Sequence, residues 1–104
     1  MKAEKKGKLE AAGFKVGSAA EFLTLSQVER AVISLRLSLA GEVRRRRIKL
    51  NCSQEDLARR IGSSQSRVAK IEAAEPNVSL DLLIRTLLAT GARPRDVARV
   101  VAAA

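Results

Sequence analysis

Four neighbouring polar side chains carry the chemistry that this sequence most clearly offers. Their amide, hydroxyl and cationic groups are donors of the kind that pair with DNA base edges and phosphates. These residues are Gln65, Ser66, Arg67 and Lys70. Val68 precedes Lys70 and Ile71 follows it, at a spacing that turns both apolar side chains towards the other face of a helix. The segment is therefore predicted to be a short helix with a polar, cationic outer face.

A second short helix is predicted directly before this one, over residues 53–62. Ser53 is a favourable N-cap, and Asp56 stands three residues later, close to a capping box. Gly62 suits the left-handed residue that ends such a helix, and Ser64 can cap the next one. The apolar face of this helix comprises Leu57, Ala58 and Ile61.

Two short helices joined by such a turn form a helix-turn-helix, which presents its second helix to the major groove of DNA. The same pattern also occurs in helical proteins that do not bind DNA. The spacing alone therefore leaves both interpretations open.

The charge of the chain favours DNA binding. The 104 residues include 20 Lys and Arg against 11 Asp and Glu, a formal net charge of +9. The first 50 positions hold 12 basic and 5 acidic residues, and the rest of the chain holds 8 and 6. Positive charge that gathers in one half of a chain is typical of a polyanion binder. The alternative is a basic surface that serves solubility alone.

Catalytic and metal-binding functions are not indicated. The chain has no histidine, and its single cysteine, Cys52, excludes an internal disulfide and a zinc-finger spacing. Cys52 is expected to be a buried, inert thiol. Four carboxylates are spaced as helix-surface and cap residues and not as part of a catalytic pair: Glu55, Asp56, Glu72 and Asp81. We therefore expect no enzyme activity, no cofactor and no metal.

The sequence also bears on location. It contains no recognisable signal peptide and no apolar run of the roughly 18 residues that a membrane-spanning helix needs. Only Phe14 and Phe22 are aromatic, which leaves little to stack on RNA bases or to anchor in a membrane interface. We expect a cytoplasmic, nucleoid-associated protein.

The longest helix is predicted to begin at the capping box of Ser26 and Glu29 and to end near Asn51. Ile33 and Leu37 lie off its apolar stripe, so the apolar face is wider than one contact surface needs. Residues 44–47 are four arginines, and at least one must face the domain body because each helical step rotates by about 100°. The stripe itself recurs at steps of three and four residues: Val28, Val32, Leu35, Leu39 and Val43.

Two further helices are predicted after the central pair. Pro76 and Asn77 form a turn, and Ser79 then caps a helix that stops at Gly91. Pro94 opens a final helix, since proline is favoured in the first turn. No convincing strand pattern is present, and the fold class is predicted to be all-α.

Residues 39–97 resemble the DNA-binding domain of phage repressors and Cro-like regulators, the XRE-type family. Spacing and residue type agree across four helices. The resemblance implies a five-helix domain that binds a palindromic operator in double-stranded DNA as a homodimer. The matching residues are Val43, Arg47, Leu50, Ser53, Gln54, Leu57, Ala58, Ile61, Gly62, Ser64, Gln65, Ser66, Val68, Ile71, Glu72, Ser79 and Leu80.

The resemblance also implies roles for single residues. The base-contacting positions are those of Gln65, Ser66 and Lys70. The DNA-backbone contacts are expected from Gln54, Ser64 and Arg67, together with Arg44, Arg45 and Arg46 of the arginine run. Arg47 and Glu72 occupy positions where family members often carry a buried ion pair. Ala73 and Ala74 replace the usual Asn-Gly, and no cation follows them up to residue 78, so minor-groove contact from this loop is not expected.

The N-terminal third lies outside that domain. We expect a disordered basic tail over residues 1–8, an extension over 9–37 that includes a short helix opening at Ser18, and the DNA-binding domain over 38–104. The extension resembles a subset of these regulators that act as antitoxins beside a small ribonuclease toxin and autoregulate their operon. The residues expected to bind such a toxin are Phe14, Phe22, Ile33 and Leu37. The alternative is a stand-alone homodimeric repressor whose extension serves dimerisation.

Overall fold

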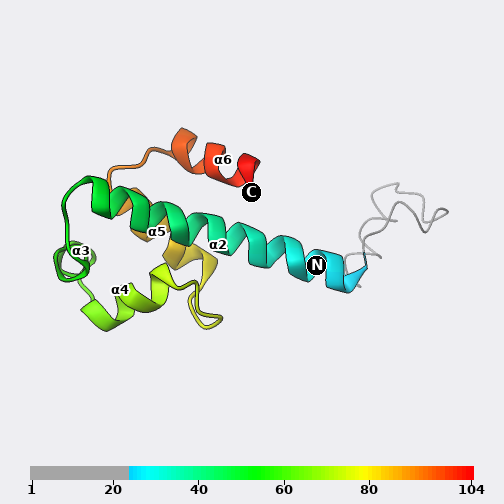
Figure 1. Cartoon of the computed structure of the whole chain (residues 1–104), viewed down its shortest axis with the longest axis horizontal. Helices are drawn as coiled ribbons and strands as arrows, with labels where there is room; N and C mark the ends of the chain where they lie inside the picture. The colour runs from blue at the N-terminus through cyan, green and yellow to red at the C-terminus, as the bar shows by residue number, and fades with distance from the viewer. Residues whose placement is uncertain (1–23) are drawn as a thin grey trace. The chain divides into compact units, whose positions relative to one another are not determined.

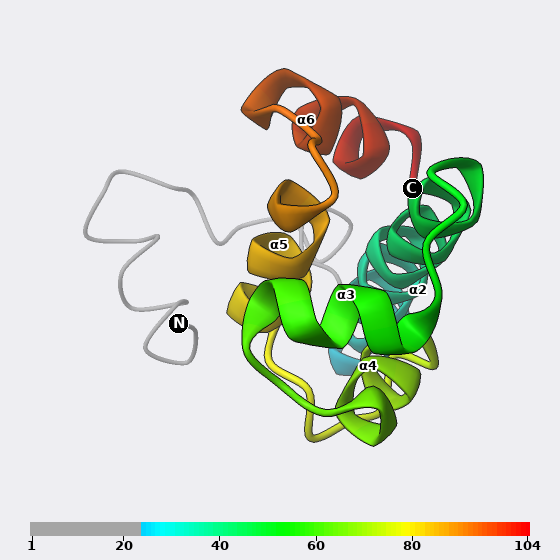
Figure 2. The same cartoon turned by 90° about the vertical axis from the view of Figure 1, so that its left-hand side faces the viewer.

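The computed structural model describes residues 24–104, and this part of the chain is all-α, as the sequence predicted. Five helices follow one another here without a strand: α2 (Leu25–Lys49), α3 (Gln54–Ile61), α4 (Gln65–Glu72), α5 (Leu80–Ala89) and α6 (Pro94–Ala103). Residues 31–104 form one compact unit. Within it, α6 lies on one side of α2, and α3 and α4 lie on the other (Figures 1 and 2).

Several expectations concern residues outside the described range. They are the tail over 1–8, the helix that opens at Ser18, and the side chains of Phe14 and Phe22. None of the helices within residues 24–104 combines the length and the apolar character that crossing a bilayer requires.

The core lies where α2, α3, α4 and α5 meet. It removes apolar side chains from water, which is the main favourable contribution to folding. On α2 the apolar stripe is buried only from Leu39 onward, and Val28 and Val32 remain exposed. The buried apolar residues are Leu39, Ala40, Val43, Leu57, Ala58, Val68, Ile71, Val78, Leu83, Leu87 and Ala92. The half-buried Cys52 packs against this cluster and is not fully enclosed by it.

Serine caps fix the starts of three helices as predicted. The hydroxyl oxygens of Ser53, Ser64 and Ser79 each accept a hydrogen bond from the backbone N–H three residues later, at 3.0 to 3.2 Å. Each bond satisfies a donor that the first turn of a helix leaves free. Gly62 ends α3 with φ = 66°, and Pro94 stands in the first turn of α6.

The capping box predicted at the start of α2 is wrong by two residues. The box is formed by Thr24, whose Oγ1 accepts from the backbone N–H of Gln27 (3.2 Å), and by Gln27, whose Oε1 accepts from the backbone N–H of Thr24 (2.7 Å). Thr24 and Gln27 have the same spacing as Ser26 and Glu29, and this pair was not predicted. At the other end, Asn51 takes the left-handed conformation that was predicted, with φ = 58°.

The loop between α4 and α5 takes its shape from two features. Ala74 has φ = 53°, a left-handed conformation that costs a residue with a Cβ about 1–2 kcal/mol. Arg36 of α2 reaches across to this loop, and its Nη2 donates to the backbone carbonyl of Glu75 at 2.6 Å. That second contact could not be predicted from local sequence patterns, because it joins residues 39 positions apart.

Candidate nucleic-acid interface

The packing of α3 against α4 sets the position of the polar helix. Val68 and Ile71 of α4 are fully buried, and they share the core with Leu57 and Ala58 of α3. With one face of α4 fixed in this way, its other face is turned to solvent. Gln65, Ser66, Arg67 and Lys70 are all exposed on it, as the spacing of the apolar residues predicted.

A polar groove of about 210 Å³ runs beside the first turns of α4. Ser64, Ser66, Arg67 and Lys70 line one side, and Asn77 from the following loop lines another. The sequence predicts only a turn at Asn77. Its amide adds a donor and an acceptor to the hydroxyl and cationic groups of α4.

An ion pair ties α2 to the end of α4. Arg47 Nε lies 2.5 Å from Glu72 Oε2, and its Nη2 lies 3.1 Å from Glu72 Oε1. Arg47 Nη1 also donates to the backbone carbonyl of Cys52 at 2.9 Å. The two side chains are only 12% and 4% exposed, and the hydrogen bonds to Glu72 raise the pKa of Arg47 above its ordinary value. The guanidinium therefore joins α2, the α2–α3 turn and α4.

This ion pair continues into the start of the polar face through two glutamines. Gln54 Nε2 donates to Glu72 Oε1 at 3.0 Å. Gln54 Oε1 in turn accepts from Gln65 Nε2 at 2.6 Å. The first residue of α4 is thus oriented by a chain of hydrogen bonds that starts at Arg47 of α2.

The orientation of Gln65 has a chemical consequence. A glutamine amide has two N–H donors and one oxygen acceptor, and the bond to Gln54 uses one donor. The second N–H and the oxygen remain, and this is the pair of groups that can bind adenine in a bidentate manner in the major groove. Arg67 and Lys70, further along the face, have no carboxylate partner within residues 24–104.

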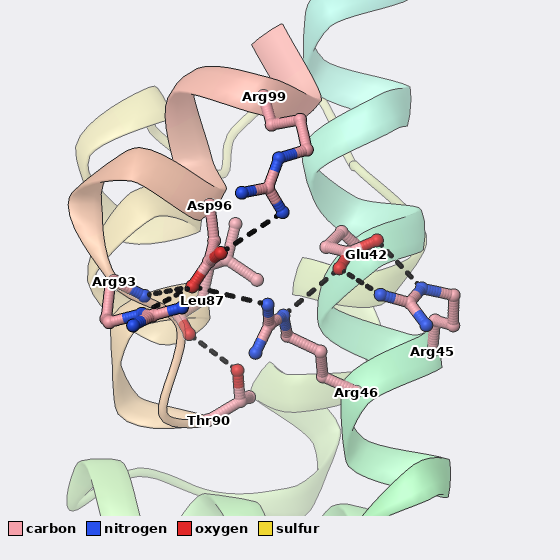
Figure 3. Close-up of polar contacts among 8 residues, drawn as sticks. All are labelled: Glu42, Arg45, Arg46, Leu87, Thr90, Arg93, Asp96 and Arg99. Atoms are coloured by element: carbon pink, nitrogen blue, oxygen red, sulfur yellow. Dashed lines mark hydrogen bonds and ion pairs between the residues drawn. The ribbon is translucent and has the colours of Figure 1, made fainter. Parts of the chain in front are cut away.

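The arginine run divides between two sides of the molecule. Arg45 and Arg46 are engaged by Glu42 of the same helix, with Nε to carboxylate oxygen distances of 2.9 and 3.0 Å (Figure 3). Arg46 Nη2 also lies 3.6 Å from Asp96 Oδ2 of α6. Arg44, by contrast, is exposed and has no ion-pair partner among the described residues.

The pairing of Glu42 with Arg45 and Arg46 could have been predicted from the sequence. Glu42 stands three and four residues before Arg45 and Arg46, the spacing at which helical side chains meet. The contribution of Asp96 could not be read in that way, because it comes from α6. These contacts with arginine hold the pKa of Glu42 below its ordinary value, the hydrogen bond from Arg45 having the largest effect.

Two of the residues expected to bind a partner can be placed. Ile33 and Leu37 are 54% and 56% exposed on α2, away from the core. No group of three or more acidic, cysteine or histidine side chains within residues 24–104 is arranged to hold a metal ion.

The central part of the chain matches a known protein family. The family model described as helix-turn-helix matches residues 43–96, just over half of the chain. This range begins at the buried Val43 of α2 and ends in the first turn of α6, and it contains the whole of α3, α4 and α5. Comparisons with curated proteins and with solved structures gave no significant match.

Proposed function

This chain belongs to the XRE-type helix-turn-helix family, whose members are DNA-binding regulators of transcription, and from that premise we propose that it is a sequence-specific repressor with α4 as its reading helix. The observation that carries the proposal is the outer face of α4, where an oriented Gln65 stands beside Ser66 and Lys70. Amide and ammonium groups of this kind discriminate between base edges in the major groove.

We assign the DNA backbone to a second set of residues. Ser64 and Arg67 line the groove beside this face, and Arg44 is exposed on α2; Arg67 and Arg44 have no acidic partner in the described part of the chain. Contacts to phosphate position a protein on the duplex without reading sequence. In this proposal the protein binds a palindromic operator as a homodimer, so that each half-site receives one α4.

The assignment is tested by measuring affinity for the operator and for random DNA in parallel. Gln65→Ala and Lys70→Ala are expected to weaken operator binding by about 1–3 kcal/mol each while leaving random DNA less affected. Arg44→Ala is expected to weaken both to the same extent. Arg85→Gln, on the exposed side of α5, is the control and should change neither. Equal losses on both DNAs for Gln65→Ala and Lys70→Ala would place the reading helix elsewhere.

We further propose that the chain is an antitoxin whose N-terminal third binds a small ribonuclease toxin and that it autoregulates its own operon. The support is the apolar surface of α2 outside the core. Ile33 and Leu37 are large, exposed and one turn apart, and burial of such residues stabilises an interface by about 25 cal/mol per Å² of apolar surface. Phe14 and Phe22, which lie outside the described residues, are further candidates for contact with this partner.

Co-expression with the neighbouring gene product tests this second proposal. A paired Ile33→Asn, Leu37→Asn variant, or deletion of residues 1–25, is expected to abolish co-purification while operator binding persists. Leu80→Asn and Leu88→Asn, which alter exposed leucines of α5, serve as matched controls. If the altered chain instead becomes monomeric in analytical ultracentrifugation and the neighbour never co-purifies, the extension is a dimer element and the antitoxin proposal fails.

A further inference from the structure

A cavity of about 430 Å³ lies between α2 and α6. This volume falls within the range of roughly 300–1,000 Å³ that is typical of sites for small ligands. In Figures 1 and 2, α6 and α4 lie on opposite sides of α2. The α2–α6 cavity is thus separate from the proposed DNA-binding surface, and what it binds does not depend on that proposal.

Positive charge exceeds negative charge at this cavity. The carboxylate of Glu42 is shared by Arg45 and Arg46, and that of Asp96 is shared by Arg46, Arg93 and Arg99 (Figure 3). Arg93 does not line the cavity, so three guanidinium groups there share two carboxylates, and one positive charge is in excess.

Both oxygens of Asp96 already accept hydrogen bonds. Oδ2 accepts from the backbone N–H of Arg93 at 2.8 Å, and Oδ1 accepts from Arg99 Nη1 at 3.3 Å. Arg99 uses one of its five N–H groups for this hydrogen bond, and its side chain is 72% exposed. The remaining N–H groups form a planar fork that matches a carboxylate or a phosphate.

Gly41 opens the α2 wall of the cavity. A Cβ at this position would meet no atom within 4 Å, so close packing within the described chain does not require glycine here. Glycine in the middle of a helix is unfavourable relative to alanine. The missing side chain leaves open space opposite Val100 and Ala103, the apolar residues that α6 contributes to the lining.

We propose that the α2–α6 cavity binds a small organic anion. Its carboxylate or phosphate group is held by Arg46 and Arg99, and its apolar body lies between Gly41 and the side chains of Val100 and Ala103. Concave sites that combine apolar walls with a few convergent polar groups are the common form of small-molecule sites. A ligand there bridges α2 and α6 through the surplus guanidinium charge.

The test is a titration of the full-length, ¹⁵N-labelled chain with three related probes, followed by NMR. Benzoate and phenyl phosphate carry the two candidate anionic groups, and benzyl alcohol is the uncharged match. Saturable shifts of the Gly41, Val100 and Ala103 amide signals are expected with one or both anions and not with benzyl alcohol. The anion that binds more tightly identifies the group that the cavity prefers. Shifts near Ser64 and Lys70 are read separately, because phosphate can also bind there.

Two variants and two controls make the test specific. Gly41→Leu places a branched side chain in the cavity and Arg99→Gln removes one charged donor, and each is expected to raise the apparent Kd roughly tenfold or more. Gly41→Ala should retain most of the binding, and Arg85→Gln should retain all of it. Operator binding is measured on the same samples and should be unchanged, so that failure here is distinguishable from failure of the DNA-binding proposal.

Three results would overturn the proposal. The first is the absence of saturable shifts at the cavity amides with both anions. The second is an unchanged Kd in both Gly41→Leu and Arg99→Gln. The third is a smaller species for Gly41→Leu than for the unaltered chain in sedimentation velocity, which would mean that a second copy of the chain covers the cavity.

Discussion

Replacement of Arg47 by alanine should reveal how strongly the fold depends on one buried ion pair. The change removes two hydrogen bonds to Glu72 and one to the carbonyl of Cys52, and it leaves the Glu72 carboxylate, only 4% exposed, with Gln54 as its remaining side-chain donor. Breaking a buried pair by removing one partner costs about 3–5 kcal/mol, because a charge stays buried without compensation. For a domain of this size that corresponds to a fall in Tm of at least about 10 °C.

Arg85→Ala is a control of the same chemistry. Arg85 also stands on a helix and pairs with a carboxylate, Asp81, at 2.7 Å, but its side chain is 75% exposed. Surface pairs contribute about 0–1 kcal/mol, so the Tm of this variant should stay within a few degrees of the unaltered chain. Thermal unfolding of the two variants, followed by circular dichroism under identical conditions, therefore isolates the effect of burial.

A double variant separates stability from positioning. In Arg47→Met, Glu72→Leu no charge is left unpaired, and much of the lost stability should return. The hydrogen bond that orients Gln54 is nevertheless gone, so Gln65 loses its fixed direction and preference for the operator over random DNA should fall. If Arg47→Ala instead unfolds at the same temperature as Arg85→Ala yet loses DNA binding, Arg47 is a phosphate contact and the structural interpretation is refuted.

The remaining predictions concern salt, backbone strain and pH. The logarithm of the DNA association constant, measured by fluorescence anisotropy, should fall linearly with the logarithm of the salt concentration. The slope should be about −0.9 for each phosphate neutralised, and a slope of zero would contradict the electrostatic contribution. Ala74→Gly should raise the free energy of unfolding in urea by about 1 kcal/mol, because glycine adopts φ = 53° without the strain of a Cβ, whereas an unchanged midpoint would contradict this. A backbone hydrogen bond from Arg93 lowers the folded-state pKa of Asp96, and one from Ser53 lowers that of Asp56. Both carboxylates therefore stabilise the fold above the unfolded pKa of about 4. This stabilisation is lost as the pH falls through the folded-state pKa. Asp96→Asn should therefore lower Tm at pH 7 and flatten its decline between about pH 5 and pH 2, and an equally steep decline would count against Asp96 as a source of acid lability.

Local signals made most of the fold predictable. The caps at Ser53, Ser64 and Ser79 act over three residues, and Gly62 and Asn51 take backbone conformations that few other residues tolerate. Such features depend only on residues that are close in sequence, so they can be predicted without knowledge of the tertiary structure. Where two equivalent signals overlap, as at Thr24 and Ser26, spacing alone could not choose between them.

The candidate interface was predictable in its residue types but not in its connections. The apolar spacing of Val68 and Ile71 placed Gln65 and Lys70 on the outer face, and the structure has both of them exposed there. The bond between Gln65 and Gln54 was not predicted, because it depends on the crossing of α3 and α4. Arg36 and Asp96 were missed for the same reason, since each meets its partner on a helix or loop that is distant in sequence.

Most of the arginines at residues 44–47 are paired within the protein, so the net charge overstates what this run can offer to DNA. A formal charge of +9 with four consecutive arginines suggests that the run faces phosphate, but the structure pairs Arg45 and Arg46 with Glu42, and Arg47 with Glu72. Only Arg44 of the run is without a carboxylate partner within residues 24–104. On α4, Arg67 and Lys70 likewise have no carboxylate partner within residues 24–104, whereas the paired Arg46 and Arg99 line the α2–α6 cavity. Because counterion release depends on phosphates contacted and not on total charge, the salt dependence should report the smaller set near α4.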